Sequence, residues 1–176
     1  FSDYISAHTS GVISAYSEIE IHLTQDLNPG VEPGTVVEAD IFDFSPSLEG
    51  ETIWESSNQI RFIPNEPLKP GQQYKAEFEL GAISPVSAEF KTFEFAFQAI
   101  EQNFSLLNYH IENYQNTDLI WNMLKGELSN ADLTNASELE EFLEFSGIPS
   151  ERIHWSMGSN AHRWRFVIDS MERKEE

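Results

Sequence analysis

The feature that most constrains this chain is an alternation of apolar and polar residues with a period of two. Ile19, Ile21 and Leu23, for example, alternate with polar or charged neighbours. Successive side chains of a β-strand point to opposite faces, so this period predicts strands with one buried and one solvated face. Its recurrence along the chain favours an all-β fold of antiparallel sandwiches. The alternating segments are 18–24, 74–80, 93–97, 107–112, 153–157 and 164–169.

Proline and glycine residues separate these segments at points where the chain must reverse. Pro fixes φ and Gly accepts a positive φ, so their combinations predict tight turns. Between Val36 and Phe62 the pattern predicts three further short strands without defining their register. The clearest turn signals lie at 28–30, 32–34, 48–50, 69–71 and 84–85.

One segment, near residues 136–146, has the pattern of a helix rather than a strand. Its apolar residues are spaced to form one stripe, and glutamates occupy the other side. Asn135 or Ser137 is suited to cap its start, where early glutamates also favour the positive end of the helix. Gly147 followed by Pro149 predicts its end.

The length of 176 residues suits one domain or two β-sandwiches of about 80–100 residues each. We place a boundary near Ala99–Gln102, where one block of strands ends and another begins. The sequence therefore predicts two consecutive antiparallel sandwiches, 1–100 and 101–176, the second carrying the short helix. The join lacks the composition of a flexible linker, so we expect little freedom between the two.

The formal net charge of −20 argues against partners that are themselves strongly anionic. Nucleic acids and anionic membrane surfaces are bound by clustered Lys and Arg, so we expect neither as a partner. The chain has no cysteine, which excludes disulfides, thiolate metal sites and cysteine nucleophiles. It contains neither an apolar run near the length of a membrane-spanning helix nor a signal-peptide pattern. Because it begins abruptly at Phe1, we expect a fragment or a mature chain without its leader.

The first predicted domain contains the order strand, Phe-x-Pro, Pro-Leu-x-Pro-Gly-x-x-Tyr, strand. Its parts are Phe62-Ile63-Pro64, at the end of the stretch from Gln59, and the run from Pro67 to Tyr74. This order resembles bacterial immunoglobulin-like domains, in which the Pro-Gly turn directs the Tyr side chain into the core. The resemblance implies a β-sandwich, and proteins of many functions share it.

The second predicted domain narrows the resemblance. Leu124–Asp132 precedes the acidic helix, Ile153-His154-Trp155 follows it, and His162–Phe166 leads to Met171-Glu172-Arg173. This series is similar to the second macroglobulin-like domain of bacterial α2-macroglobulins. Together with Thr9–Ser14, the resemblance covers most of the chain.

That resemblance implies a non-catalytic N-terminal piece of a larger bacterial protease inhibitor, which faces the periplasm and is lipid-anchored in its full-length form. The partners implied are the downstream domains of the same chain and, through the full-length protein, proteases. Contact with a membrane would come only through a tether outside this segment. Many family members form a thioester from a Cys-x-x-Gln type motif far downstream. Since this chain has no cysteine and no identifiable bait region, no catalytic residue of the family is carried over.

The histidines are the first candidates for metal ligands in this sequence. No two of them have the i, i+2 or i, i+4 spacing that favours a compact zinc site. His22, His110 and His154 share the parity of their polar neighbours, so we expect them to face solvent. His162 has the parity of Trp164 and is expected at a hydrogen-bonded edge of the core.

Other site chemistries have little support in the sequence. Oxygen ligands for calcium could come from Asp26, Glu38, Asp40 and Asp43, but there is no Asp-x-Asp-x-Asp loop. The chain also lacks a Gly-x-Ser-x-Gly elbow and a Gly-rich phosphate loop. The sequence therefore predicts no catalytic, cofactor-binding or metal-ligating residue, and no cofactor.

Large aromatic rings in β-sandwiches usually pack in the core, and an exposed row of them would instead indicate a carbohydrate-binding face. The tryptophans expected in the core are Trp54, Trp121, Trp155 and Trp164.

Arg163 and Arg165 are expected opposite the core face of their strand, where they can pair with glutamates of a neighbouring strand.

Two functions of different classes follow. The leading hypothesis is a structural and interaction module of an α2-macroglobulin-like protease inhibitor in the bacterial cell envelope. The alternative is a generic cell-surface immunoglobulin-like module for adhesion or glycan binding. An enzyme of unrecognised type has no constellation of residues in its favour.

Overall fold

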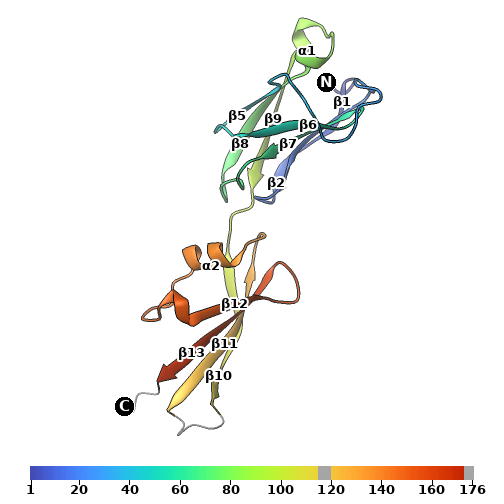
Figure 1. Cartoon of the computed structure of the whole chain (residues 1–176). Helices are drawn as coiled ribbons and strands as arrows, with labels where there is room; N and C mark the ends of the chain where they lie inside the picture. Colours follow the sequence, from blue (N-terminus) through green and yellow to red (C-terminus); the bar gives the residue numbers. More distant parts are fainter. Residues whose placement is uncertain (115–119, 173–176) are drawn as a thin grey trace. The chain divides into compact units, whose positions relative to one another are not determined.

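The computed structural model describes residues 1–114 and 120–172 and consists mainly of β-strands (Figure 1). The chain divides into two compact units, Phe1–Ile100 and Glu101–Glu176, which we call unit 1 and unit 2. The prediction of an all-β fold with one short helix is confirmed: among the described residues, only α2 (Ala136–Phe142) has more than one turn. Within the described ranges, no helix is long and apolar enough to cross a lipid bilayer.

Unit 1 is a sandwich of two sheets. The five-stranded sheet has the order β1-β3-β7-β6-β4 and is antiparallel throughout, and the four-stranded sheet has the order β2-β9-β8-β5. β2 pairs parallel with β9, in contrast to its otherwise antiparallel sheet. Because only Thr9 and Ser10 separate β1 from β2, the chain changes sheets there without room for a hairpin. The strands are β1 Ile5–His8, β2 Gly11–Ile13, β3 Ile19–Leu23, β4 Thr35–Val36, β5 Phe42–Ser45, β6 Gly50–Ser56, β7 Gln59–Pro64, β8 Gln73–Glu79 and β9 Thr92–Ala99.

The core of unit 1 lies between these sheets. The ring of Phe62 on β7 contacts Phe42 and Phe44 on β5, with ring centroids 5.9 and 4.7 Å apart. The predicted alternation holds on β3, where Ile19 and Ile21 are fully buried. A single helical turn, α1 (Leu80–Ile83), and a 3-10 turn, η1 (Ala88–Phe90), connect β8 to β9.

The turn at 69–71 places a tyrosine in this core, as the sequence predicts. Gly71 has a φ of +74°, a conformation that glycine adopts without steric cost. Tyr74, three residues later on β8, is buried, and its hydroxyl oxygen accepts a hydrogen bond from the backbone N–H of Lys69 at 3.1 Å. The side chain thus ties its own strand to the preceding turn.

Unit 2 is built on one antiparallel four-stranded sheet with the order β10-β11-β13-β12. The connection from β11 to β12, which contains α2 (Ala136–Phe142) and η2 (Ser150–Arg152), covers part of one face of the sheet (Figure 1). Among the described residues, this connection takes the place of the second sheet that a sandwich would have. The strands are β10 Phe104–Asn113, β11 Trp121–Asn130, β12 Ile153–Met157 and β13 Arg163–Glu172.

The helix in this connection is shorter than the predicted 136–146. Of the two predicted capping residues, Asn135 is the cap: its side-chain oxygen accepts a hydrogen bond from the backbone N–H of Glu138 at 3.1 Å. The helix ends at Phe142, and Leu143 already has extended backbone angles. The extended chain lets Leu143 and Phe145 reach the core of the sheet, which a continued helix would carry away from it.

The core of unit 2 is small and off-centre. Its buried part comes from β11, β12 and β13 and consists of Leu128, Ile153, Phe166 and Ile168. The fourth strand, β10, is exposed along almost its whole length. The prediction of a half-buried strand at 107–112 is therefore wrong in its burial. The strand exists, but α2 contacts it at its first residue, with the ring centroids of Phe104 and Phe142 5.9 Å apart, and residues 107–112 stay exposed.

Candidate functional site

The predicted orientation of three histidines is observed. His22 lies on the solvent side of β3 with its Nε2 atom 3.1 Å from the carboxylate of Glu20, His110 lies 3.0 Å from Glu112, and His154 is exposed. The prediction for His162 is wrong, since its side chain is exposed. β13 begins only at Arg163, so the alternation does not extend back to the turn that holds His162.

The acidic residues considered for calcium are not brought together. Asp26 accepts a hydrogen bond from the hydroxyl of Ser57 at 2.7 Å, and Glu38, Asp40 and Asp43 are exposed. Over residues 1–114 and 120–172, no three His, Asp or Glu side chains gather closely enough to hold a metal ion.

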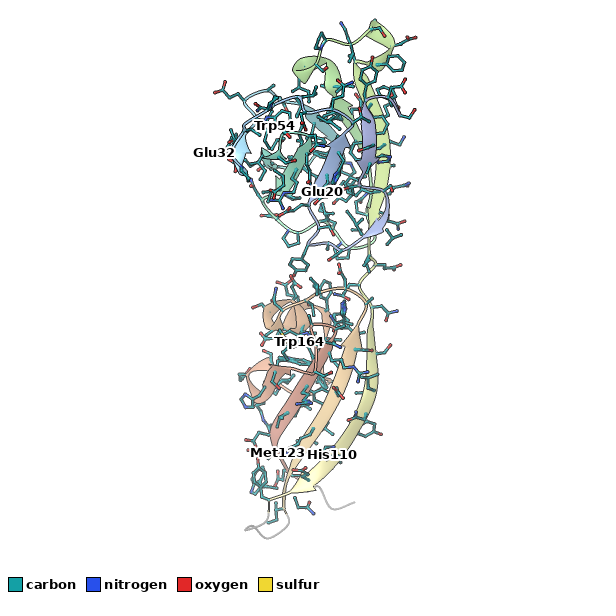
Figure 2. All side chains as sticks on the ribbon, turned by 90° about the vertical axis from the view of Figure 1, so that its right-hand side faces the viewer. Glu20, Glu32, Trp54, His110, Met123 and Trp164 are labelled. Carbon is teal, nitrogen blue, oxygen red and sulfur yellow. The ribbon has the colours of Figure 1, made fainter. Side chains whose placement is uncertain are left out.

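The tryptophans divide between core and surface. Trp54 and Trp164 are buried; Figure 2 labels the first in unit 1 and the second in unit 2. Trp155 is partly buried, with its ring centroid 5.9 Å from that of Phe166. The prediction for Trp121 is wrong, because 42% of its surface is exposed. It begins β11 five residues before Gly126, so its side chain lies on the face of the sheet opposite the one that carries Phe166 and the core.

Charged side chains on the solvated faces pair across strands. Arg163 and Arg165 lie opposite the buried face of β13, and Arg163 lies 3.9 Å from Glu127 on β11, so the predicted cross-strand pairing is confirmed for Arg163. In unit 1, Arg61 on β7 contacts the carboxylates of both Glu18 and Glu55. Such contacts align neighbouring segments of the sheets.

A buried polar cluster in unit 2 had no signal in the sequence pattern. Asn130 and Asp132 are the buried polar residues at the end of β11. The Asn130 amide donates to the backbone oxygens of Asp132 and Ala161, and the Gln102 amide donates to those of Asp132 and Leu133. These bonds join the start of β10, the end of β11 and the turn before β13, which gives the cluster a structural role.

One surface depression in unit 1 has a volume of about 590 Å³ and lies beside the Pro-Gly turn. Its lining includes the carboxylates of Glu49 and Glu66 and the Lys69 side chain, all on exposed residues. It contains no pairing of a nucleophile with a base, so its chemistry does not indicate catalysis.

A row of exposed apolar side chains follows β10. Among described residues, the exposed large apolar side chains of this strand are Leu106 (54%), Leu107 (42%), Tyr109 (64%) and Ile111 (61%). We call these four residues the β10 surface. Isolated exposed apolar residues are common, but a row of them along one strand indicates an interaction site.

The opposite, polar face of the β10–β11 pair, which we call the hairpin, centres on Glu112. Its carboxylate accepts a hydrogen bond from Lys125 Nζ at 2.6 Å and lies 3.0 Å from His110 Nε2. The bond from Lys125, and next the one from His110, lower the pKa of Glu112 below its ordinary value. Figure 2 labels His110 and Met123 on this hairpin, where Glu112 pairs with Met123.

Comparisons with known proteins identify no family for this chain. No protein-family model matches it, and no curated protein matches it. Among solved structures, it is similar to L,D-transpeptidase 3 from Mycobacterium tuberculosis, with 6% sequence identity and a TM-score of 0.39. The match covers 93% of this chain and 56% of that one. None of these comparisons names a macroglobulin, and the likeness to the transpeptidase is too slight to support an activity.

Proposed function

We propose that this chain is a non-catalytic structural and interaction portion of a larger α2-macroglobulin-like protease inhibitor of the bacterial cell envelope. In this role the two units position the domains that follow them and connect those domains to the membrane tether. No bond is made or broken by the chain itself. Proteases would meet it only as part of the full-length protein.

The observation that carries the proposal is the separation of core from charge. The interiors of both units are filled mainly by apolar side chains, whereas ion pairs such as Arg61 with Glu18 and Glu55, Lys125 with Glu112, and Arg163 with Glu127 join neighbouring segments on the outer faces. Catalytic sites instead need titratable groups that converge in a cleft. The Pro-Gly turn with the buried Tyr74 fits the immunoglobulin-like part of the resemblance, which the proposed function and its alternative share.

The decisive experiment is to determine the coding sequence on the C-terminal side of Glu176. The proposal expects further β-domains followed by a large helical domain with a Cys-x-x-Gln motif or its remnant. A stop codon directly after this position, or an unrelated catalytic domain, would contradict it.

A biochemical test is independent of the gene. The purified chain is mixed with a panel of proteases, and peptide hydrolysis and protease inhibition are both measured. The proposal expects neither activity, because trapping would require the rest of the protein. Stoichiometric inhibition by this chain alone would overturn the supporting role.

The alternative, a glycan-binding or adhesion module, is favoured by the exposed aromatic residues Tyr109 and Trp121. Their placement on the sheet argues against one platform, however. Tyr109 pairs with Gly126, and Trp121 is five residues from Gly126 on the same strand, so the two rings belong to opposite faces. Binding to a glycan array that is lost in Trp121→Ala would support this alternative.

A further inference from the structure

β10 differs in length from the other strands at sheet edges. It has ten residues and forms one edge of the unit 2 sheet, whose other edge strand, β12, has five. The edge strands of unit 1 have between two and four residues. Proteins commonly protect sheet edges by keeping them short, and β10 does not have this protection among the described residues.

The hydrogen-bonding pattern identifies which backbone groups of β10 are directed away from β11. The N–H of Tyr114 donates to the oxygen of Trp121, in register with the pairing of Asn113 with Asn122. Residues of an antiparallel pair alternate between hydrogen-bonded and non-hydrogen-bonded positions. The backbone groups of Glu112 and His110, two and four residues before Tyr114, therefore bond to β11. Tyr109 and Ile111 therefore direct their N–H and C=O groups toward the free edge.

The side chains at this edge lack the features that discourage strand pairing. Between Phe104 and Asn113 there is no proline, lysine or arginine, and Glu112 is the only acidic residue. Tyr109 and Ile111, whose backbone groups point outward, also carry the most exposed side chains of the β10 surface. Backbone groups and apolar side chains are thus available together, which is the requirement for strand addition.

The charge of the chain decides which strand is favoured. The described residues between 101 and 130 carry Glu101, Glu112 and Glu127 against Lys125. Glu112 already pairs with Lys125, and Glu127 lies near Arg163, so the attraction for a basic strand comes mainly from the net charge of −20 of the whole chain. A second copy would meet like charge, whereas a basic strand would be attracted. We propose that the β10 edge binds an extended polypeptide segment in which apolar residues alternate with basic ones. This proposal does not depend on the family to which the chain belongs.

In the expected complex, the incoming strand extends the sheet beyond β10. Its apolar residues lie beside Tyr109 and Ile111, on the face that carries the core, and its basic residues lie on the face of Glu112. Backbone hydrogen bonds supply affinity, and the alternate side chains supply specificity.

The test uses the full chain and three end-capped, fluorescein-labelled peptides of nine residues, measured by fluorescence anisotropy. One alternates valine with lysine, the second alternates valine with glutamate, and the third has the composition of the first with its lysines in one block. We expect the alternating valine–lysine peptide to bind at least about tenfold more tightly than the other two. On binding, the amide protons of Tyr109 and Ile111 should gain protection from exchange in NMR spectra.

Variants of the chain locate the binding. Tyr109→Thr combined with Ile111→Thr places two β-branched residues, which favour strands, at these positions. The double substitution removes two cross-strand apolar pairs and should weaken binding about three- to tenfold. Val12→Thr, at an exposed position of β2 in unit 1, is the matched control and should leave binding unchanged. Ile111→Pro should also weaken binding, because proline has no backbone N–H and the free edge loses one hydrogen-bond donor.

Several outcomes would overturn the proposal. Equal binding of the block peptide would mean that charge alone attracts the ligand. Failure of the valine–lysine peptide to bind, or protection of amides outside β10, would exclude the edge as its site. Dimers of the chain alone that disappear in the Tyr109→Thr/Ile111→Thr variant, detected by sedimentation, would assign the surface to a second copy instead.

Discussion

The hydroxyl of Tyr74 accepts a hydrogen bond from the backbone N–H of Lys69, five residues earlier, at 3.1 Å. Tyr74 is only 2% exposed and stacks on Phe97, so the bond connects the Pro-Gly turn to the core of unit 1. Replacing the hydroxyl leaves the ring in place and removes only this acceptor.

Tyr74→Phe should lower the free energy of unfolding of unit 1 by about 1–2 kcal/mol, the usual effect of leaving a partly buried donor unpaired. Urea unfolding can be followed by fluorine NMR after labelling with 5-fluorotryptophan, since Trp54 is the only tryptophan of residues 1–100. Tyr109→Phe, which changes an exposed tyrosine of unit 2, should leave the midpoint of the Trp54 resonance unchanged. An unaltered midpoint in Tyr74→Phe would mean that the bond contributes nothing.

Gly126 on β11 lies directly against Phe166 on β13. A Cβ atom at this position would lie 2.3 Å from Cζ of Phe166 and 2.9 Å from the backbone oxygen of Asn108. Because the Phe166 ring is buried, Gly126→Ala should destabilise unit 2 by about 1–3 kcal/mol through overpacking. The measurement is the urea midpoint of the labelled Trp164 resonance.

Two further variants separate overpacking from other causes of that effect. Ser129→Ala, on the same strand, should have little effect on the Trp164 midpoint. Phe166→Leu should destabilise unit 2 by itself, and the additional cost of Gly126→Ala should be smaller in its presence. If the destabilisation by Gly126→Ala and that by Phe166→Leu are additive in the double variant, the contact with the Phe166 ring does not explain why glycine is needed at position 126.

Arg61 lies between two carboxylates on neighbouring segments. Its guanidinium is 2.5 Å from Glu18 and also contacts Glu55, and each of the three side chains is roughly one-third exposed or less. Arg61→Met keeps much of the alkyl stem and leaves two glutamates without their counter-charge, which should cost about 1 kcal/mol in unit 1 after allowance for solvent screening. High salt should reduce this difference. Combining Arg61→Met with Glu18→Gln and Glu55→Gln should recover stability, and a further loss would contradict the electrostatic explanation.

Glu112 provides a prediction on pH. The bond from Lys125 is the main cause of the lowered pKa of the Glu112 carboxylate in the folded state. At a pH above 4.5, the ordinary pKa of this group, the ionised carboxylate therefore stabilises the folded state. This contribution should decrease as the pH falls through the lowered pKa, because protonation of the carboxylate then ends the pairing.

The titration of the Glu112 side-chain carbonyl carbon by NMR measures this directly. Lys125→Met should raise the pKa of Glu112 toward its ordinary value, and His110→Gln should raise it less, in keeping with the order of the two causes. A larger effect from His110→Gln would reverse the assignment of the dominant partner.

Much of unit 1 follows from local sequence patterns. Alternation identified the buried faces of β3 and β8, and the Pro-Gly turn placed Tyr74 in the core, because each depends only on the backbone geometry of a few residues. In unit 2, the start of α2 could also be predicted from local sequence, because the Asn135 side chain caps it by accepting a hydrogen bond from the backbone N–H of Glu138. The parallel pairing of β2 with β9 was not predicted, because pairing partners far apart in sequence leave no local signal.

The alternation of side chains therefore determined where most strands run and which residues share a face. Tertiary structure alone decided whether another part of the chain packs on that face. Leu107, Tyr109 and Ile111 repeat the period of a buried strand yet stay exposed, because the connection through α2 packs on Leu128, Phe166 and their neighbours instead. Burial is a property of what lies opposite a side chain, and a period of two carries no information on that.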